Sequence, residues 1–407
     1  MKLLIYEPNH TGHHFAYLAR MLPGVTGLPI DIIVATKPRA IESDEFDKTL
    51  KDFGDRLEYV TCCSDAPGTT LGNARHRANE FLRTLELTRP DHAWIMYGDG
   101  LWQILAVNNR LNTNPIASRI PIEAWLYRGG FSYPTATGFG DRMKRLLFRR
   151  LARKRGFTAL HLDDEYLYDF ARVIDPGPSA TEMVLTPNPI ELRPLEPDTA
   201  LEARKRLGLP EQGRIVSLTG MIDSRKGADL LIRAFAEHHR RADAADSHLV
   251  LGGPHDDRIK AVLEEPGIAR LKTDGHIICQ DRFFSADEMF DVAAASTLVT
   301  APYPNHSGRS SIILWAAAAG RPSLGVDRGC IDRVITEEKL GWTCDVSDIE
   351  AFARAIGEAL EQPWGPEEQA RVRRYAEFHR VENYQRIASS RIRRRLDMTA
   401  AHSTEEA

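Results

Sequence analysis

The residues best suited to chemistry in this chain lie in a short polar stretch, NHSGRSS, over residues 305–311, which leads into an apolar, alanine-rich helical pattern. The first turn of a helix presents free backbone N–H groups and the positive end of the helix dipole. The side chains add hydroxyls, a guanidinium and an open backbone: Ser307, Gly308, Arg309, Ser310 and Ser311. This combination predicts a binding site for an anion such as a diphosphate. The alternative is that a serine only caps the helix.

A second loop in the same half of the chain carries positive charge at the end of a strand. The stretch LTGMIDSRKG leads from Gly220 through Arg225 and Lys226 into an amphipathic helical pattern. Lys226 can meet a phosphate as a point charge, whereas Arg225 can equally point to solvent. The alternative for both is an exposed charge on a loop. Two loops in the same half of the chain that are both suited to bind an anion favour a shared ligand.

The first half of the chain has its own polar groups after strand-like runs. Gly12, His13 and His14 follow the first strand, and the two histidines could contact a phosphate or a hydroxyl, or simply be exposed or capping. Asp99 lies between two glycines and could orient a substrate hydroxyl, take its proton, or cap a helix. Arg128 cannot act as a base, but it can hold a phosphate or a carboxylate.

Short β-branched runs, seven in the first half and six in the second, alternate with helical patterns along the chain. They predict βαβ units with parallel sheets. We therefore predict an α/β fold with two tandem Rossmann-like domains and a ligand site in the cleft between them, beyond the carboxyl ends of the strands. The predicted parts are a first domain, a proline-rich linker, a second domain, a C-terminal helix packing back on the first domain, and a tail: 1–190, 191–212, 213–380, 381–397 and 398–407.

The composition describes an ordinary globular protein. Of the 407 residues, 43% are hydrophobic and 27% are charged, and the net charge of −4 gives no overall attraction to nucleic acid or membrane. The N-terminus lacks the pattern of a signal peptide, and no apolar run approaches the ~18 residues of a membrane span. Five cysteines without C-x-x-C spacing indicate reduced thiols: Cys62, Cys63, Cys279, Cys330 and Cys344. We expect a cytoplasmic protein.

One helical pattern is strongly basic. Residues 142–155 hold eight lysines or arginines, and we expect an apolar stripe to pack inward: Met143, Leu146, Leu147 and Leu151. The cations could form an ordinary solvated face or attract an anionic membrane surface. Nucleic acid is disfavoured because no aromatic residues are interleaved for stacking.

The second half resembles a known family. Over residues 213–362 it is similar to the donor-binding domain of retaining GT-B glycosyltransferases of the family 4 type. Gly220 and Lys226-Gly227 match parts of the G-R-L-x-x-x-K-G loop of that family, and AAAAGRPSL matches the helix end after its E-x7-E motif. The resemblance implies a nucleotide diphosphate sugar as donor, and it places Arg282 and Phe283 at the nucleobase. The alternative for Phe283 is a core position.

Under this interpretation, the groups after the first-half strands bind the acceptor: Gly12, His13, His14, Asp99 and Arg128. The catalytic candidates are Lys226, Arg309, Asp99 and His13, because Lys226 and Arg309 would stabilise the leaving diphosphate and Asp99 could take a proton. We expect no metal, because the chain lacks a strict Asp-x-Asp motif and Asp163-Asp164-Glu165 fits the acidic first turn of a helix.

Four positions depart from the family pattern. Met221 replaces the arginine of the first motif, Ser307 and Trp315 replace both glutamates of the second, and Arg128 stands where related enzymes usually have a histidine. The function that the sequence predicts is sugar transfer, with retention, from a nucleotide diphosphate sugar to a glycan or lipid-linked acceptor. The alternatives are a non-catalytic sugar-nucleotide binding protein and a sugar-nucleotide epimerase of the same fold.

Overall fold

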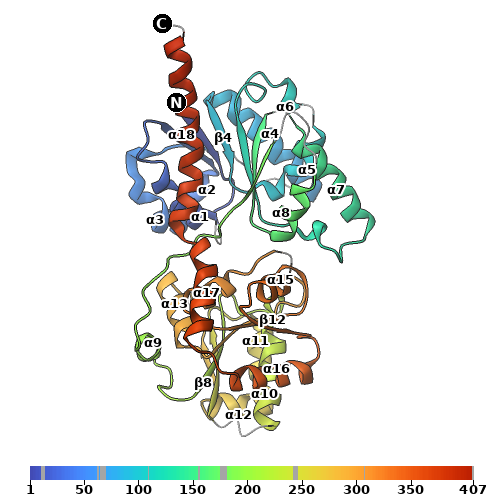
Figure 1. The fold of residues 1–407 in the computed structure, drawn as a ribbon, viewed down its shortest axis with the longest axis vertical. Helices are drawn as coiled ribbons and strands as arrows, with labels where there is room; N and C mark the ends of the chain where they lie inside the picture. Colours follow the sequence, from blue (N-terminus) through green and yellow to red (C-terminus); the bar gives the residue numbers. More distant parts are fainter. Residues whose placement is uncertain are drawn as a thin grey trace. The chain divides into compact units, whose positions relative to one another are not determined.

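The computed structural model describes residues 1–10, 14–61, 64, 70–108, 110–154, 156–174, 181–241, 246–306 and 308–405. The chain forms two compact units (Figure 1). Unit 1 consists of Met1–Pro189 and Val381–Ala407, and unit 2 consists of Ile190–Arg380.

Unit 1 is built on a seven-stranded parallel sheet in the order β3-β2-β1-β4-β5-β6-β7. The strand order reverses between β1 and β4, as in a doubly wound Rossmann-like sheet. All seven strand-like runs of the first half form strands, which confirms this part of the prediction. The strands are β1 Lys2–Tyr6, β2 Asp31–Thr36, β3 Glu58–Thr61, β4 His92–Ile95, β5 Ile122–Leu126, β6 Phe157–Leu162 and β7 Glu182–Leu185.

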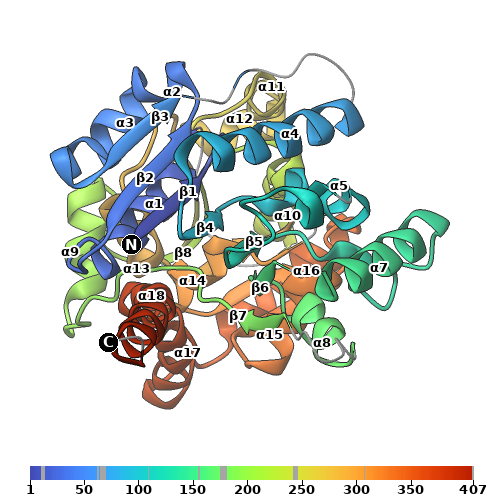
Figure 2. The same cartoon turned by 90° about the horizontal axis from the view of Figure 1, so that it is seen from above.

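Helices cover both faces of this sheet, so the strands are nearly continuous apolar runs. Figure 2 shows α4, α5, α7 and α8 on one side and α1, α3 and α18 on the other. The helices are α1 His14–Met21, α2 Pro38–Ile41, α3 Asp44–Thr49, α4 Thr70–Thr88, α5 Trp102–Val107, α6 Arg110–Thr113, α7 Phe139–Ala152, α8 Glu165–Arg172 and α18 Val381–Glu405, with the short 3₁₀ turns η1 Leu22–Gly24, η2 Lys51–Arg56, η3 Gly98–Gly100 and η4 Gly130–Ser132.

The C-terminal helix α18 packs against α1 in unit 1. Its side chains Tyr384, Ala388 and Ile392 are buried in the core beneath the sheet. The helix continues to Glu405, beyond residue 397, where we predicted a tail. Residues 398–405 contain neither glycine nor proline, so no residue breaks the helix there.

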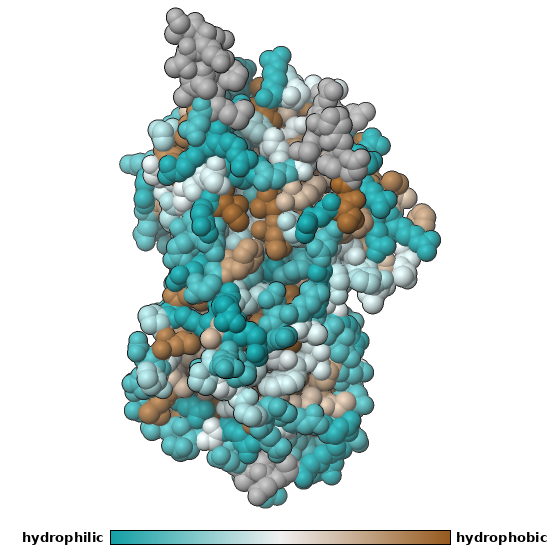
Figure 3. Space-filling model, in the orientation of Figure 1, coloured by the Kyte–Doolittle hydropathy of each residue, from teal (hydrophilic) through white to brown (hydrophobic). Residues whose placement is uncertain are grey.

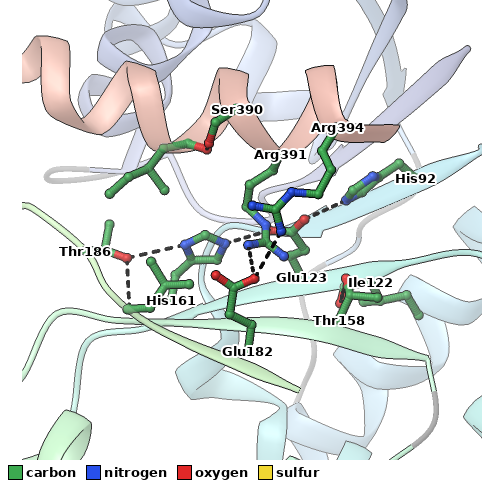
Figure 4. Close-up of polar contacts among 12 residues, drawn as sticks. His92, Ile122, Glu123, Thr158, His161, Glu182, Thr186, Ser390, Arg391 and Arg394 are labelled. Carbon is green, nitrogen blue, oxygen red and sulfur yellow. Dashed lines mark hydrogen bonds and ion pairs between the residues drawn. The ribbon is translucent and has the colours of Figure 1, made fainter. Parts of the chain in front are cut away.

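A buried charged cluster fastens α18 to the sheet (Figure 4). Glu123 of β5 accepts hydrogen bonds from His92 Nε2 at 2.9 Å and from His161 Nε2 at 2.6 Å. Its carboxylate also pairs with Arg391 Nε of α18 at 2.5 Å. Burial alone would raise the pKa of Glu123, but the hydrogen bonds from His161 and His92 hold this pKa well below its usual range. Arg391 reaches Glu182 as well, at 2.8 Å.

The basic helix α7 faces differently from the prediction. Phe148 and Leu151 are buried and Leu147 is partly buried, whereas Met143 is 41% exposed and Leu146 is 58% exposed. The inward stripe is therefore shifted by about one residue position. Sequence spacing defines an apolar face but does not say which edge of that face meets the sheet.

Unit 2 has a six-stranded parallel sheet in the order β10-β9-β8-β11-β12-β13. All six predicted strands are present, again with the Rossmann-like reversal next to the first strand of the sheet. The strands are β8 Arg214–Thr219, β9 Ser247–Gly252, β10 Ile277–Gln280, β11 Leu298–Ala301, β12 Ser323–Val326 and β13 Gly341–Cys344. The helices are α9 Thr199–Leu207, α10 Ala228–Arg241, α11 Asp257–Leu263, α12 Pro266–Thr273, α13 Ala286–Ala295, α14 Ser311–Ala318, α15 Gly329–Glu337, α16 Ile349–Glu361 and α17 Pro366–Phe378, with the 3₁₀ turn η5 Ser224–Lys226.

The segment 191–212, predicted as a linker, contains helix α9 and belongs to unit 2. Its sequence TALEARKRL is rich in strong helix formers, and Gly208 ends the helix in the left-handed conformation. Arg206 holds it to α13 by donating to both carboxylate oxygens of Asp291, at 2.9 and 2.8 Å. The prolines that indicated a linker lie outside the helix.

In the part of the chain that the structure describes, no helix is long and apolar enough to cross a membrane. Cys279, Cys330 and Cys344 are free thiols, and Cys62 and Cys63 lie outside the described residues.

Candidate functional site

Lys226 occupies a built position at the carboxyl end of β8. Asp223 caps the turn η5 by accepting the backbone N–H of Lys226 at 2.9 Å, and this turn directs the lysine side chain back toward the sheet. The ammonium Nζ donates to the carbonyl of Thr219 at 2.7 Å, and the side chain is buried. Burial and the neighbouring charge of Arg225 lower the pKa of Lys226 to about 8. Lys226 is therefore a preorganised cation, unlike an exposed loop charge.

Gly220 makes room for this ammonium. Its φ is +88°, and a Cβ there would lie 2.4 Å from Lys226 Nζ. The end of β9 also comes close, since a Cβ on Gly253 would lie 1.9 Å from the carbonyl oxygen of Gly220. Glycines at the ends of β8 and β9 therefore allow the Lys226 ammonium and the backbone of the neighbouring strand to approach Gly220 closely.

Replacing Gly220 with alanine should weaken anion binding by about tenfold or more, because the methyl group must displace the ammonium. The measurement is titration calorimetry with nucleoside diphosphates. Gly275→Ala is the matched control: Gly275 has φ +82°, but a Cβ added there would meet no atom within 4 Å. It carries the same backbone strain without the clash. Equal losses of affinity in both variants would attribute the effect to strain alone.

Tyr303 brings the two predicted anion loops together. Lys226 Nζ lies 5.9 Å from the centre of the Tyr303 ring, and Ser310 Oγ donates to the Tyr303 hydroxyl at 3.3 Å. Ser310 is the N-cap of α14 and accepts the backbone N–H of Ile312 at 3.3 Å. Lys226 and the start of α14 therefore share one tyrosine. Sequence reasoning missed Tyr303; its position at the end of the strand-like run STLVTAPY was the available signal.

The other residues of the α14 loop are placed differently. Gly308 is buried with φ +105°, whereas Ser311 is exposed. Arg309, predicted to face the anion, is buried, and its guanidinium Nη1 lies 3.2 Å from both ring nitrogens of His379. Ser307 lies outside the described residues.

Arg225 differs from its neighbour Lys226. Its side chain is more than half exposed and contacts Asp223 at 3.4 Å. The alternative of an exposed loop charge therefore describes Arg225. Met221, at the position of the family arginine, is also exposed, and Trp315 is half-buried on α14.

Arg282 and Phe283 follow β10 at the same edge of the sheet. Phe283 is 81% exposed, so the alternative of a core position is wrong for this residue. Phe284 points inward instead, since its ring would contact a Cβ on Gly252 at 2.6 Å. Arg282 is held by an ion pair to Glu288 at 2.6 Å, with its guanidinium 4.5 Å from the centre of the Phe284 ring.

In unit 1, His14 is the first residue of α1 and is mostly buried. Its Nδ1 lies 3.2 Å from the carboxylate of Glu7, and its ring packs edge-on against Tyr97 at 4.6 Å. Glu7, which follows β1, was not predicted as a site residue. Its contact with His14 depends on how the fold places the end of β1 beside the start of α1. Gly12 and His13 lie outside the described residues.

Asp99 organises the loop after the neighbouring strand β5. Its carboxylate accepts the backbone N–H groups of Tyr127 at 2.9 Å and Arg128 at 3.2 Å. The alternative of a helix cap is therefore wrong. Burial raises the pKa of Asp99 to about 6. Arg128 is exposed, and Tyr127 stacks on Tyr97 at 5.7 Å, so His14 and the Asp99 loop are linked through two aromatic rings.

The acidic run after β6 forms a helix start, as predicted. Asp164 caps α8 by accepting the backbone N–H of Leu167 at 2.9 Å, and it accepts the Tyr133 hydroxyl at 2.6 Å. Among the described residues, no group of three or more His, Cys, Asp or Glu side chains is placed to hold a metal ion.

Solved structures with the same architecture define the fold as GT-B. HepE from Anabaena in complex with UDP superposes with a TM-score of 0.68 at 15% identity, covering 98% of this chain and 100% of HepE. Sucrose-phosphate synthase from Thermosynechococcus elongatus superposes with a TM-score of 0.68 at 14% identity, covering 98% and 100%. The two tandem parallel-sheet units thus form a GT-B fold.

The sequence of unit 2 is similar to a known family. Residues 213–362 match the family model described as "Glycosyl transferases group 1". A GDP-mannose-dependent alpha-(1-6)-phosphatidylinositol monomannoside mannosyltransferase of Mycolicibacterium smegmatis is 28% identical over 168 residues, which cover 41% of this chain and 44% of the relative. A D-inositol 3-phosphate glycosyltransferase of Salinispora tropica is 33% identical over 165 residues, covering 39% and 33%. The matches span less than half of these relatives.

Proposed function

We propose that the chain is a glycosyltransferase that moves a hexose from a nucleoside diphosphate sugar to a glycan or lipid-linked acceptor with retention of configuration. The observation that carries this proposal is the buried ammonium of Lys226. It lies over the ring of Tyr303, whose hydroxyl accepts a hydrogen bond from Ser310, the N-cap residue of α14. A strand-end lysine beside a helix N-terminus is suited to a diphosphate. The family of residues 213–362 supports this donor class.

The barrier to such a transfer is charge separation. The anomeric carbon gains positive charge while the nucleoside diphosphate leaves with the bonding electrons, and fixed positive groups beside the diphosphate lower this barrier. Lys226 and the backbone N–H groups that begin α14 would supply that charge. Arg309 would add to the positive potential from its buried position. We propose that these groups serve in place of a metal cofactor.

The other candidate residues would contact the nucleobase of the donor and the acceptor. The exposed ring of Phe283 and the guanidinium of Arg282 would contact the base, which stacking alone does not select. One relative is named as GDP-mannose-dependent, and one structural neighbour was solved in complex with UDP, so both bases belong in the test. In unit 1, His14, Asp99 and Arg128 would meet the acceptor, and Arg128 suits an acceptor that bears a phosphate.

The test is a panel of GDP- and UDP-sugars, with calorimetry for binding and chromatography for products. We expect one nucleotide sugar to bind and free nucleoside diphosphate to appear when a hydroxyl acceptor is added. Binding without release under any acceptor would indicate a non-catalytic binding protein. Conversion of the donor into an isomer without acceptor would indicate an epimerase.

A membrane surface is proposed as the place of action. Helix α7 exposes Phe139, Met143 and Leu146, which recur at positions i, i+4 and i+7 and so line one face. The helix and its C-cap also expose five cations: Arg142, Lys144, Arg149, Arg150 and Arg153. In Figure 3, hydrophobic patches interrupt the hydrophilic surface where α7 runs. Exposed apolar side chains together with exposed cations fit an anionic bilayer, at about 1 kcal/mol per cation. We propose peripheral attachment on the cytoplasmic side.

Replacing Leu146 with aspartate should reduce binding to vesicles of anionic phosphatidylglycerol by about tenfold or more, because it removes an inserted side chain and adds a repelled charge. Co-sedimentation with vesicles measures this. Leu87→Asp is the matched control, since Leu87 is 68% exposed on α4. Wild-type binding that is equally strong to uncharged phosphatidylcholine vesicles, or absent from both, would contradict the proposal.

A further inference from the structure

The Arg309 side chain is buried against a histidine instead of being directed to solvent. His379 is fully buried and Arg309 is 6% exposed. Nη1 of Arg309 lies 3.2 Å from both Nδ1 and Nε2 of His379. In the plane of the ring, a nitrogen equidistant from both would collide with Cε1 between them. The guanidinium nitrogen therefore lies over the face of the imidazole, a cation-on-ring contact.

His379 is neutral in this environment. Burial and the adjacent charge of Arg309 lower its pKa well below the ordinary value of 6.5. A neutral ring can receive the guanidinium on its face without charge repulsion. The ring is itself packed by Tyr375 at 4.8 Å and Phe378 at 4.9 Å, so its orientation is fixed. A rigid, neutral ring thus defines where the Arg309 cation can lie.

His379 also sits where the chain passes between its two units. Its backbone carbonyl accepts the N–H of Ile190 at 2.8 Å, and Ile190 forms a parallel bridge with Arg380. The units are joined after Pro189 and after Arg380, so these paired residues are the joining segments. His379 therefore connects two places: its ring contacts Arg309 before α14, and its carbonyl binds Ile190 in a segment that joins the two units.

Burying a guanidinium is costly unless the charge is paired or hydrogen-bonded. Arg309 is one residue before the N-cap Ser310, so its backbone lies at the start of α14, while its guanidinium lies against His379. We propose that His379 is a positioning residue, which holds the Arg309 guanidinium at the diphosphate site and makes the joint between the units sensitive to the bound nucleotide. This inference rests on the proposed function.

A double-mutant cycle tests the inference. The affinities for GDP and UDP are measured by calorimetry in the wild type, Arg309→Gln, His379→Leu and the double variant. If His379 acts through Arg309, His379→Leu weakens binding about tenfold in the wild-type background and leaves the Arg309→Gln background unchanged. His379→Phe should stay within about threefold of the wild type, because it preserves an aromatic face for the guanidinium. A merely structural role would lower affinity equally in both backgrounds.

Amide hydrogen exchange provides a second measurement. It uses the wild-type protein, so it does not depend on whether a variant folds. Adding the nucleotide that binds should slow exchange at residues 188–191 and 378–381. Unchanged exchange there, or equal effects of His379→Leu in both backgrounds, would overturn this inference and leave the proposed function standing. A wild type that binds neither GDP nor UDP would overturn the proposed function itself, and this inference with it.

Discussion

Replacing Lys226 with methionine is expected to weaken nucleoside diphosphate binding about 100-fold, with little change in stability. Methionine keeps the apolar length of the side chain and removes the ammonium, which is a charge-assisted donor in a buried position. Removing a buried partner from an ionic contact typically costs 2–5 kcal/mol of binding free energy, which corresponds to about 30-fold or more. Titration calorimetry with GDP and UDP measures this loss.

The same residue predicts a pH dependence of binding. The pKa of Lys226 is lowered to about 8, so the free protein loses the ammonium as the pH rises through that value. Only the protonated lysine attracts a diphosphate, so affinity should fall above about pH 8 in the wild type and stay flat in Lys226→Met. Lys205→Met, which changes an exposed lysine on α9, is the control. Undiminished affinity in Lys226→Met would remove this residue from the site.

Replacing Glu123 with glutamine is expected to lower the free energy of unfolding by about 3–5 kcal/mol. The carboxylate is the shared acceptor of His92, His161 and Arg391, and each of its two oxygens is already engaged. A glutamine oxygen can replace only one acceptor, and the Arg391 cation is left in a nearly buried place without its main counter-charge. Breaking a buried ion pair from one side has this size of effect.

Denaturant unfolding followed by circular dichroism measures the loss, and limited proteolysis locates it. Cleavage within α18 should accelerate, because Arg391 is the charged anchor of that helix. Glu182→Gln is the matched control: Glu182 also pairs with Arg391, but it is half exposed, so the cost should stay below about 1 kcal/mol. A Glu123→Gln variant as stable as Glu182→Gln would show that the cluster contributes little to holding α18.

The inner strands of both sheets could be predicted from the sequence because parallel strands inside a sheet are buried on both faces. Each forms a short apolar run bounded by glycine, proline or polar residues, as KLLIYEP and RIVSLTG do. The positions of Lys226 and Ser310 at strand ends and helix starts followed from the same alternation. Local chemistry therefore located the loops of the site, since a loop after a parallel strand must lie at the carboxyl edge of the sheet.

The direction in which side chains point could not be predicted where their partners are distant in the chain. Arg309 turns to His379, seventy positions away, and Asp99 turns to the backbone after β5. Both contacts depend on tertiary packing. Adjacent residues raised the same difficulty: Phe283 is exposed while Phe284 packs inward, and α7 presents Leu146 outward. Sequence spacing locates an apolar face only to within about one residue position, so it cannot tell which of two adjacent residues points inward.

We propose above all that Lys226 and the start of α14 bind one diphosphate. The most direct measurement is a crystal structure with the nucleoside diphosphate that binds in solution. We predict phosphate oxygens within about 3 Å of both Lys226 Nζ and a backbone N–H in the first turn of α14. A diphosphate bound elsewhere, or one that reaches only one of these two groups, would contradict the claim.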